Sequence, residues 1–407
     1  MVNVAFLLPF AFETSLRFLE AALGLPGVRV GVVGADPIER LGPALARRLA
    51  GHWRVADPLD PRAIVAGVVG LQKQMGPIAR LVGVLEEAQV PLAVARAELG
   101  LPGLDPDSAL NFRDKARMKD VLTKAGVPCA RHRLVSSMTE ARAFASEVGY
   151  PLVVKPPSGA GARGTFRLDR AEQLEDLLPH YPPRPERPLL VEEFVTGEEH
   201  SFDSVVLGGE LVWSSVSRYF PSPLEVLRND WIQWAVLLPR EVDGPEYQPI
   251  RAAAARALPA LGLRDGLSHM EWFRRRDGSV AISEVGARPP GAQFTSLMSW
   301  AHDADLYRAW ARLAIGDRFD PPERRFAAGA VYLRGQGRGK RVVAVRGLER
   351  AQRETGELVV ECRLPRRGQR RSSSYEGEGY VIVRHPETGM VVRALERILE
   401  TVRVELG

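Results

Sequence analysis

A glycine-rich segment that follows an apolar run is the first feature of this sequence that could do chemistry. In residues 150–166, "YPLVVKPPSGAGARGTF", the glycines Gly159, Gly161 and Gly164 are spaced as G-x-G-x-x-G and come after Lys155. Backbone N–H groups of such a loop can surround phosphate oxygens, and a nearby lysine adds positive charge. Dinucleotide-binding sites and protein kinases both use this spacing. The segment therefore indicates a phosphate-binding loop, and its ligand is still open.

The residues on either side of the loop decide between these ligands. A dinucleotide site needs a helix that begins at the loop, so that its N-terminus meets the pyrophosphate. Here the loop leads into "TFRL", residues 165–168, whose β-branched and aromatic residues predict a strand. A kinase places its glycines one strand before the lysine, whereas here Lys155 comes first. We interpret the loop as the tip of a β-hairpin over phosphates; the alternative is that its glycines only permit a tight turn.

Charged residues elsewhere in the chain include the groups that an ATP site needs. ATP requires cations at its phosphates, a hydrogen-bonding segment for adenine, an acid for the ribose, and carboxylates for Mg²⁺, which prefers oxygen ligands. The sequence offers such groups in this order: Lys115 and Lys155, then Glu192, Glu193, Phe194 and Val195 with Glu199, and finally Glu271 with Glu284. The last two carboxylates interrupt or end apolar runs, "MEWF" and "VAIS", and a buried carboxylate needs a partner.

These charged residues also have ordinary structural explanations. Lys115 and Lys119 lie at helical spacing and could form ion pairs on a surface. Glu192 and Glu193 could be the exposed end of a strand. These alternatives stay open for each residue taken alone.

Two further features allow a functional and a structural interpretation. His269 would share a strand face with Glu271, where it could contact a substrate or be a hydrogen-bonded structural histidine. The aromatic and proline-rich residues 217–234 could form a pocket rim or a packed surface loop.

The composition is that of an ordinary globular protein. The 407 residues are 45% hydrophobic and 26% charged, with a net charge of +5. No apolar run approaches the roughly 20 residues that span a bilayer. Cys129 and Cys362 are too isolated for a disulfide framework or a metal-ligand cluster. We expect a cytoplasmic protein of about two to four domains.

Strand-like and helix-like runs alternate near the start of the chain. Residues 2–8 and 28–34 predict strands, with a helix over residues 14–23 between them. A helix over residues 78–89 and a strand over residues 91–95, "PLAVA", are predicted next. This alternation indicates an open, largely parallel α/β sheet.

A second unit begins near Asn111. The run "DKARMKDVLTKAG" predicts a helix capped by Asp114, and the Asp-Gly pair at 277–278 predicts a hairpin. From about Phe319 onward strand-like runs dominate, until an amphipathic helix over residues 390–402.

Four segments, in this order and with similar gaps, resemble the ATP-grasp ligases: "DKARMKDVLTKAGVP", "GYPLVVKPPSGAGARG", "LLVEEFVTGEE" and "MEWFRRRDGSVAISEVGARPPG". The resemblance, to biotin carboxylase and D-alanine–D-alanine ligase among others, implies an α/β and α+β fold. It implies an N-terminal open parallel α/β domain at 1–110 and a two-lobed ATP-grasp domain at 111–318. The flap-bearing subdomain would occupy about 130–195, and a mainly β C-terminal domain 319–407.

The resemblance also implies which residues bind ATP. They would be Lys115 and Lys155 at the phosphates, Ser158, Gly159, Gly161 and Gly164 in the flap, Glu192, Glu193, Phe194 and Val195 at the adenine, Glu199 at the ribose, and Arg218 at the γ-phosphate.

It further implies the metal and catalytic residues. Glu271 and Glu284 would bind Mg²⁺, with Mn²⁺ as an alternative, and Arg288 and Lys155 would be catalytic. The family usually has Asn two residues after the second carboxylate, where this chain has Gly286. A water or backbone group then replaces that ligand, or the second metal ion binds more weakly.

The function implied is an ADP-forming ligase. The enzyme would activate a carboxylate as an acyl phosphate for attack by an amine, on an amino-acid-type substrate. Positioning and charge neutralisation do most of this work, which suits a site rich in Lys, Arg and Glu. The partners would be small-molecule carboxylates and amines, with no nucleic acid and no membrane; a homodimer is allowed.

Three other functions stay open. A biotin-carboxylase-like enzyme would activate bicarbonate and would need a separate carrier, because the chain has no biotinyl site of the Met-Lys-Met type. A non-catalytic ATP-binding regulatory protein would account for Gly286. A nucleic-acid binder would use the arginine run at 363–371, although that run lacks interleaved aromatics and reads as a solvated hairpin tip.

Overall fold

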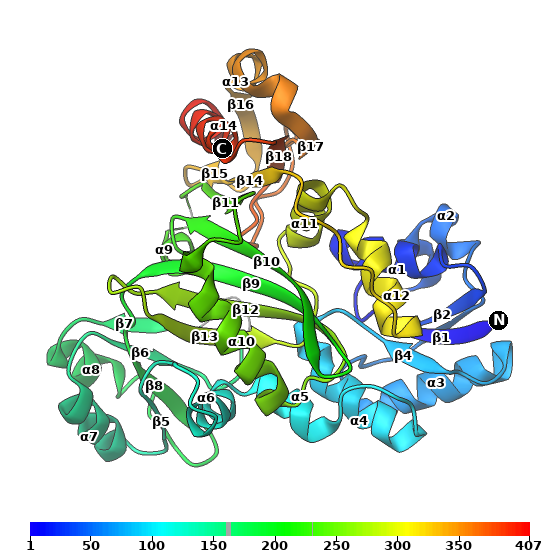
Figure 1. Ribbon diagram of the computed structural model, residues 1–407, viewed down its shortest axis with the longest axis horizontal. Coiled ribbons are helices and arrows are strands. Elements are labelled where there is room, and N and C mark those ends of the chain that lie inside the picture. Colours follow the sequence, from blue (N-terminus) through cyan, green and yellow to red (C-terminus); the bar gives the residue numbers. More distant parts are fainter. Residues whose placement is uncertain (160–163, 230) are drawn as a thin grey trace.

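Three outer bodies of structure surround a central sheet in the computed structural model (Figure 1). The N-terminal part (blue) lies on one side, a small lobe (teal) on the other, and the end of the chain (orange and red) at the top. The structure describes residues 1–159, 164–229 and 231–407. Its sheets and helices confirm the mixed α/β and α+β fold class.

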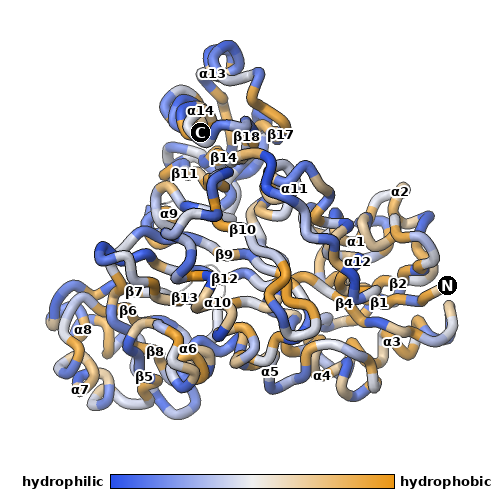
Figure 2. The backbone as a smooth tube through the Cα atoms, in the orientation of Figure 1, coloured by the Kyte–Doolittle hydropathy of each residue, from blue (hydrophilic) through white to orange (hydrophobic). Residues whose placement is uncertain are grey.

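The N-terminal sheet is parallel and covered on both faces. Its strands are β1 (Val2–Leu7), β2 (Val28–Gly34), β3 (Gly51–Arg54) and β4 (Arg80–Val82), in the order β3-β2-β1-β4. Val4 and Phe6 pack with α1 (Glu13–Leu23), whereas Ala5 and Leu7 pack with α3 (Pro61–Met75) and α4 (Gln89–Leu99). Because both faces are buried, β1 and β2 are apolar almost throughout, as Figure 2 shows.

Two predicted elements of this region are wrong. Strand β4 lies inside residues 78–89, where we expected a helix, and α4 includes "PLAVA", where we expected a strand. Leu81 and Val82 are buried in the strand beside β1, and periodicity alone cannot separate such a short apolar run from a helix. Pro91 lies in the first turn of α4, where the missing N–H of proline costs no hydrogen bond.

The small lobe is an antiparallel sheet that carries the glycine loop. It consists of β5 (His132–Val135), β6 (Leu152–Lys155), β7 (Phe166–Leu168) and β8 (Leu189–Glu193), in the order β5-β8-β6-β7. Val154 pairs with Phe166, so a strand follows the loop and the predicted hairpin is confirmed. Helices α7 (Met138–Val148) and α8 (Ala171–Leu177) contribute Phe144 and Leu174 to the core of the lobe.

The large sheet supports the other side of the site. Its first strands are β9 (Glu198–Leu207), β10 (Glu210–Phe220), β11 (Trp234–Leu238), β12 (Gly266–Arg274) and β13 (Val280–Gly286). The hairpin between β12 and β13 turns at Gly278, whose φ of 82° suits glycine. The helices of this region are α5 (Pro106–Arg113), α6 (Lys115–Lys124), α9 (Pro223–Arg228), α10 (Gln248–Leu261), α11 (Phe294–His302) and α12 (Leu306–Gly316).

The cap of α6 is the predicted one. Asp114 accepts hydrogen bonds from the backbone N–H groups of Ala116 and Arg117, which would otherwise lack partners at the helix start. The helix therefore begins at Lys115, which fixes that lysine at the edge of the site.

The C-terminal strands extend the large sheet. Strands β14 (Ala327–Leu333), β17 (Val359–Arg363) and β18 (Gly379–His385) give the order β13-β12-β9-β10-β11-β14-β18-β17. Strands β15 (Gly335–Gln336), β16 (Val342–Arg346) and β19 (Arg403–Leu406) form a separate sheet. Helix α14 (Thr388–Thr401) packs on β14 and β18, close to the helix predicted over residues 390–402.

The other helical segments are short. They are η1 (Ile38–Leu41), α2 (Pro43–Ala46), η2 (Glu86–Ala88), η3 (Pro245–Tyr247), α13 (Leu348–Thr355) and η4 (Gly356–Leu358). Across the described parts of the chain, every helix is too short or too polar to span a membrane.

Candidate active site

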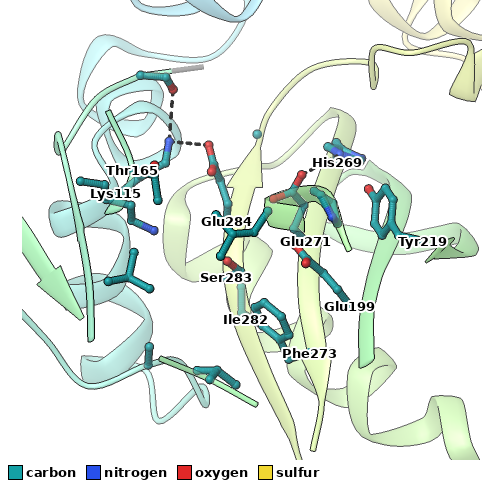
Figure 3. A pocket seen from close by; sticks show the side chains of 18 of the residues that line it. Lys115, Thr165, Glu199, Tyr219, His269, Glu271, Phe273, Ile282, Ser283 and Glu284 are labelled. Carbon is teal, nitrogen blue, oxygen red and sulfur yellow. Dashed lines mark hydrogen bonds and ion pairs between the residues drawn. The ribbon is translucent and has the colours of Figure 1, made fainter. Parts of the chain in front are cut away.

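One pocket gathers most of the residues predicted for ATP. In Figure 3, Lys115 and Thr165 lie on one side of it, and Glu271 and Glu284 on the other. The predicted residues that line the pocket are Lys115, Lys155, Gly159, Glu192, Glu193, Phe194, Val195, Glu199, Glu271, Glu284 and Arg288.

Glu271 and Glu284 meet because β12 and β13 pair directly at these two residues. Met270 and Trp272 flank Glu271 and are fully buried in the core beneath α10. Since side chains alternate along a strand, Glu271 points to the opposite face, which is the pocket. The apolar neighbours that make Glu271 stand out in the sequence are thus the residues whose burial directs its side chain into the pocket.

The two carboxylates fit a magnesium ion that substrate phosphates help to hold. Mg²⁺ is usually bound through one or two carboxylates, with phosphates and waters completing its shell. In the parts of the chain that the structure describes, no group of three or more His, Cys, Asp or Glu side chains could hold a metal by itself. A Cβ added at Gly286 would meet Arg288 Cγ at 3.5 Å, an ordinary contact, so a ligating side chain would have room there.

Lys115 connects the start of α6 to both the metal carboxylates and the glycine loop. Its Nζ lies 2.6 Å from Glu284 Oε1 and 3.2 Å from the carbonyl oxygen of Gly159. The backbone N–H of Lys115 also donates to the carbonyl of Pro157 at 2.7 Å. The base of the loop is therefore attached to the helix that supplies the lysine.

Glu192 is buried between two lysines. Its Oε2 lies 2.8 Å from Lys155 Nζ, and its Oε1 lies 3.4 Å from Lys119 Nζ. Burial raises the pKa of Glu192, but the two lysine charges outweigh burial and hold the pKa below its usual value. Lys119 is 1% exposed, so the surface-pair explanation of Lys115 and Lys119 is wrong, as is that of Glu192 as an exposed strand end. Oε1 of Glu192 has no hydrogen-bond partner among the described residues.

The three residues after Glu192 form the pocket wall next to it. Glu193 pairs with Arg131 at 2.7 Å and with Arg275 at 3.3 Å, and Arg167 lies over the ring of Phe194. Val195 also lines the pocket. The predicted adenine segment is thus an ordered part of the wall.

The pKa values of Glu199 and Glu271 are shifted in opposite directions because their surroundings differ. Burial, and then the charge of Glu271, raises the pKa of Glu199 to about 8, against an opposing effect of Lys155. Burial also raises the pKa of Glu271, but the hydrogen bond and charge of His269 outweigh it, and the pKa lies below its usual value. Glu271 therefore ionises more readily than Glu199.

His269 has a clear structural role beside the pocket. Its Nδ1 lies 2.7 Å from Asp203, and its Nε2 lies 3.8 Å from Glu271. Burial lowers the pKa of His269, but the charge and hydrogen bond of Asp203 and the hydrogen bond of Glu271 raise it to about 9. The imidazolium therefore bridges two carboxylates, and since it also lines the pocket, a substrate contact stays open.

Arg288 is paired with a residue that the sequence did not single out. Its Nη2 lies 2.5 Å from Glu86 Oε2 and its Nε lies 3.1 Å from the same oxygen. Arg113 approaches Glu86 Oε1 at 3.4 Å. Glu86 begins η2, four residues after the end of β4, on the side of the carboxyl ends of the parallel strands. In sheets of this kind ligands bind beyond those ends, where the strand order reverses. A correct assignment of β4 would have pointed to Glu86.

The predicted flap residues have different outcomes. Ser158 and Gly164 flank the loop, and Gly164 has a φ of 70° that favours glycine. Gly159 lines the pocket, and its carbonyl accepts from Arg113 at 2.9 Å. Gly161 lies outside the described residues.

Arg218 is not brought to the pocket. It lies on β10 next to Tyr219, and because side chains alternate, Tyr219 faces the pocket and Arg218 faces away. The Nη2 of Arg218 donates to the hydroxyl of Tyr247 at 2.9 Å. Its position does not support the predicted γ-phosphate contact.

The segment 217–234 forms part of the pocket wall, which supports the rim interpretation over a packed surface loop. Its pocket-lining residues are Tyr219, Pro223, Leu224, Val226 and Trp234. Tyr375, from the loop between β17 and β18, also lines the pocket. No signal in the sequence indicated that Tyr375 belongs to the site.

Large parts of the chain are similar to known proteins. Residues 120–298 match the model of the ATP-grasp domain family. The uncharacterized protein y4rH of Sinorhizobium fredii is 28% identical over 345 residues, which cover 82% of this chain and 70% of that protein. The L-arginine-specific L-amino acid ligase of Bacillus subtilis is 23% identical over 271 residues, or 65% of each chain. The match thus spans slightly less than two thirds of that ligase.

A solved structure shares the fold over its whole length. The crystal structure of an L-amino acid ligase from Bacillus licheniformis has a TM-score of 0.81, at 19% identity, covering 100% of this chain and 99% of that one.

Proposed function

We propose that the protein is an ATP-dependent, ADP-forming ligase that joins a carboxylate to an amine, because residues 120–298 match the ATP-grasp domain family. One observation carries this proposal. The paired carboxylates Glu271 and Glu284 share a pocket with Lys115, Lys155 and Arg288, beside the glycine loop. Such a set of charges suits phosphoryl transfer, which depends on positioning and charge neutralisation.

The two ends of the pocket suit the two ends of ATP. Lys115 and Lys155 would contact the phosphates at the base of the glycine loop. Glu192 Oε1, a buried acceptor that Lys119 Nζ approaches only at 3.4 Å, would accept from the adenine amino group. Glu199, whose side chain also lines the pocket, would bind a ribose hydroxyl.

The reaction would proceed in two balanced steps. A carboxylate oxygen attacks the γ-phosphorus, the bond between that phosphorus and the ADP oxygen breaks, and an acyl phosphate forms. The amine nitrogen then attacks the acyl carbon, the bond to phosphate breaks, and an amide, phosphate and one proton are released. Arg288 would stabilise negative charge on the transferred group. Mg²⁺ held by Glu271 and Glu284 would neutralise charge on the phosphates.

An amino acid is the carboxylate that the comparisons favour. An L-amino acid ligase is among the relatives in sequence, and another shares the fold over the full chain. The amine would then be a second amino acid or a small primary amine.

The proposal is tested by a screen for ADP release over pairs of carboxylates and amines, with wild type, Glu284→Gln and Glu210→Gln. Glu210 is an exposed glutamate on β10 and serves as the matched control. We expect amino-acid pairs to release ADP and to yield an amide, Glu284→Gln to lose this activity, and Glu210→Gln to keep it.

Three outcomes would contradict the proposal. Turnover by Glu284→Gln at the wild-type rate and Mg²⁺ dependence would remove the metal assignment. ATP binding without ADP release on any pair would favour a regulatory ATP-binding protein. Release that depends on bicarbonate and a biotin carrier would favour a carboxylase.

A further inference from the structure

The Glu86–Arg288 pair has hydrogen-bonding groups left for a ligand that carries one positive and one negative charge. Of the five guanidinium N–H groups, Nε and one of Nη2 bind Glu86 and one of Nη1 binds the carbonyl of Pro289, so two donors have no partner among the described residues. A carboxylate has about four lone-pair sites, and within the same described residues Glu86 uses two for Arg288 and one for Arg113, so about one remains. The groups left for a ligand are thus two N–H donors of Arg288 and one acceptor site of Glu86.

Arg288 and Glu86 both line the pocket and are partly shielded from solvent. The side chains of Arg288 and Glu86 are 17% and 15% exposed, and both line the pocket. Two donors and one acceptor on adjacent groups match an α-amino acid, whose carboxylate accepts two hydrogen bonds and whose ammonium donates. A carboxylate without an ammonium group would leave the acceptor of Glu86 unused.

An aromatic wall continues from this charged pair. Tyr375 lines the same pocket as Arg288 and Glu86, and its backbone carbonyl accepts from Trp234 Nε1 at 2.8 Å. The rings of Trp234 and Phe294 lie 6.5 Å and 5.9 Å from that of Tyr219. We call these four residues, Tyr219, Trp234, Phe294 and Tyr375, the aromatic chamber; Leu224 and Val226 add aliphatic surface beside it.

We propose that the activated carboxylate belongs to an α-amino acid with a large apolar side chain, bound with its ammonium group at Glu86, its carboxylate at Arg288 and its side chain in the aromatic chamber. This rests on the proposed function, because it names the acid that the ligase would activate. Glu86 is the residue that selects amino acids over simple carboxylic acids. By holding the ammonium group in its charged form, Glu86 also prevents the first substrate from acting as the attacking amine.

The test compares two ligands that differ only in the ammonium group. L-phenylalanine and 3-phenylpropanoate are titrated into wild type, Glu86→Gln and Glu87→Gln by calorimetry, with and without a non-hydrolysable ATP analogue and Mg²⁺. Glu87 is the exposed neighbour of Glu86 in the same turn and serves as the matched control. Loss of a charged hydrogen bond, about 1.5–3 kcal/mol, predicts a ten- to hundredfold weaker binding of L-phenylalanine to Glu86→Gln. Binding of 3-phenylpropanoate should be weak in wild type, unchanged in Glu87→Gln and no weaker in Glu86→Gln, because the lost carboxylate competes for Arg288.

A second pair of variants tests the chamber. Tyr375→Phe should keep the preference for L-phenylalanine over L-alanine in both binding and ADP release, because the ring is retained. Tyr375→Ala should reduce that preference at least about tenfold, the size of effect expected for a buried aromatic contact. Thermal unfolding of each variant is the control: a midpoint equal to that of the wild type shows that the fold is intact.

The outcomes separate this inference from the proposed function. Equal effects of Glu86→Gln on the two phenyl ligands, or a preferred acid without an amino group, overturn the inference while the ligase activity stands. Binding of L-phenylalanine that depends on Glu86, without ADP release on any pair, supports the binding site and overturns the ligase. A preference for small or charged amino acids overturns the chamber.

Discussion

Lys115 Nζ lies 2.6 Å from Glu284 Oε1, although 169 positions separate the two residues in the chain. The lysine begins α6 and the glutamate lies near the end of β13, so this ion pair connects the two sides of the pocket. The same lysine also holds the carbonyl of Gly159 at the base of the glycine loop. Three predicted parts of an ATP site thus converge on one ammonium group.

Replacing Lys115 should weaken ATP binding. Lys115→Met removes a charged contact worth about 1.5–3 kcal/mol, so the KM for ATP should rise roughly ten- to hundredfold. Lys124→Met, at an exposed position in the last turn of the same helix, is the control and should change nothing. An unchanged KM in Lys115→Met would show that this lysine does not contact the phosphates.

Glu192 should matter for stability as well as for ATP. Glu192→Gln leaves the buried charges of Lys119 and Lys155 without their counter-charge, a change that typically costs about 3–5 kcal/mol of unfolding free energy. Glu193→Gln breaks pairs with arginines that are 61% and 39% exposed, and it should cost less than about 1 kcal/mol. Urea denaturation of the two variants measures both values, and equal losses would contradict the buried-pair interpretation.

A ligating side chain at Gly286 should increase the affinity of the site for Mg²⁺. Gly286→Asn should lower the Mg²⁺ concentration for half-maximal ADP release by roughly tenfold, comparable with the effect of one supporting contact at a metal site. Gly286→Ala adds the same Cβ without a ligand and should leave that concentration unchanged. If the alanine variant had the same effect, backbone restriction and not ligation would be the cause.

His302 should make the protein sensitive to acid. Burial, and then the charge of Arg324, lowers the pKa of His302 to about 3, whereas in the unfolded chain it is about 6.5. A depressed histidine pKa means that the unfolded state binds the proton first. Stability is therefore retained above pH 6.5 and falls, by up to about 1.4 kcal/mol per pH unit from this group, as the pH decreases toward 3. Denaturation curves at pH 7, 6 and 5 should show a shallower decline for His302→Gln than for wild type; parallel declines would contradict the assignment.

Arg218 should be dispensable for ATP. Because its guanidinium contacts Tyr247 on the far side of β10, Arg218→Gln should keep the KM for ATP while losing about 1–3 kcal/mol of stability. Lys155→Gln should raise that KM at least about tenfold. Calorimetric titration with ATP, under conditions in which both variants are folded, distinguishes Arg218→Gln from Lys155→Gln. A loss of ATP affinity in Arg218→Gln would support the predicted γ-phosphate contact.

Much of the site could be predicted because its residues interrupt clear patterns. Glu271 stands out within an apolar strand, and pairing with β13 then determines where it points. Lys155 before the glycines and the strand after them predicted the hairpin that β6 and β7 form. Local sequence was enough in these cases, because the chemistry and the strand lie within a few residues of each other.

Contacts between distant segments could not be predicted in the same way. Glu86 reaches Arg288 across 202 positions, and the strand before Glu86 was too short and too apolar to be distinguished from a helix. The sequence leaves a surface position for Lys119 open, because only the fold places Glu192 against it. Arg218 was misplaced because its strand register decides its face, and that register depends on β9 and β11.

The hydrogen bonds between β11 and β14 make the last part of the chain inseparable from the rest. Five residues of β11, from Trp234 to Leu238, pair with five of β14, and Trp234 also holds the loop that carries Tyr375. A protein truncated before Ala327 would present β11 as an unprotected edge, open to association with other chains. Trimming this chain to its nucleotide-binding core should therefore produce an aggregating fragment, and cooperative unfolding should involve both regions at once.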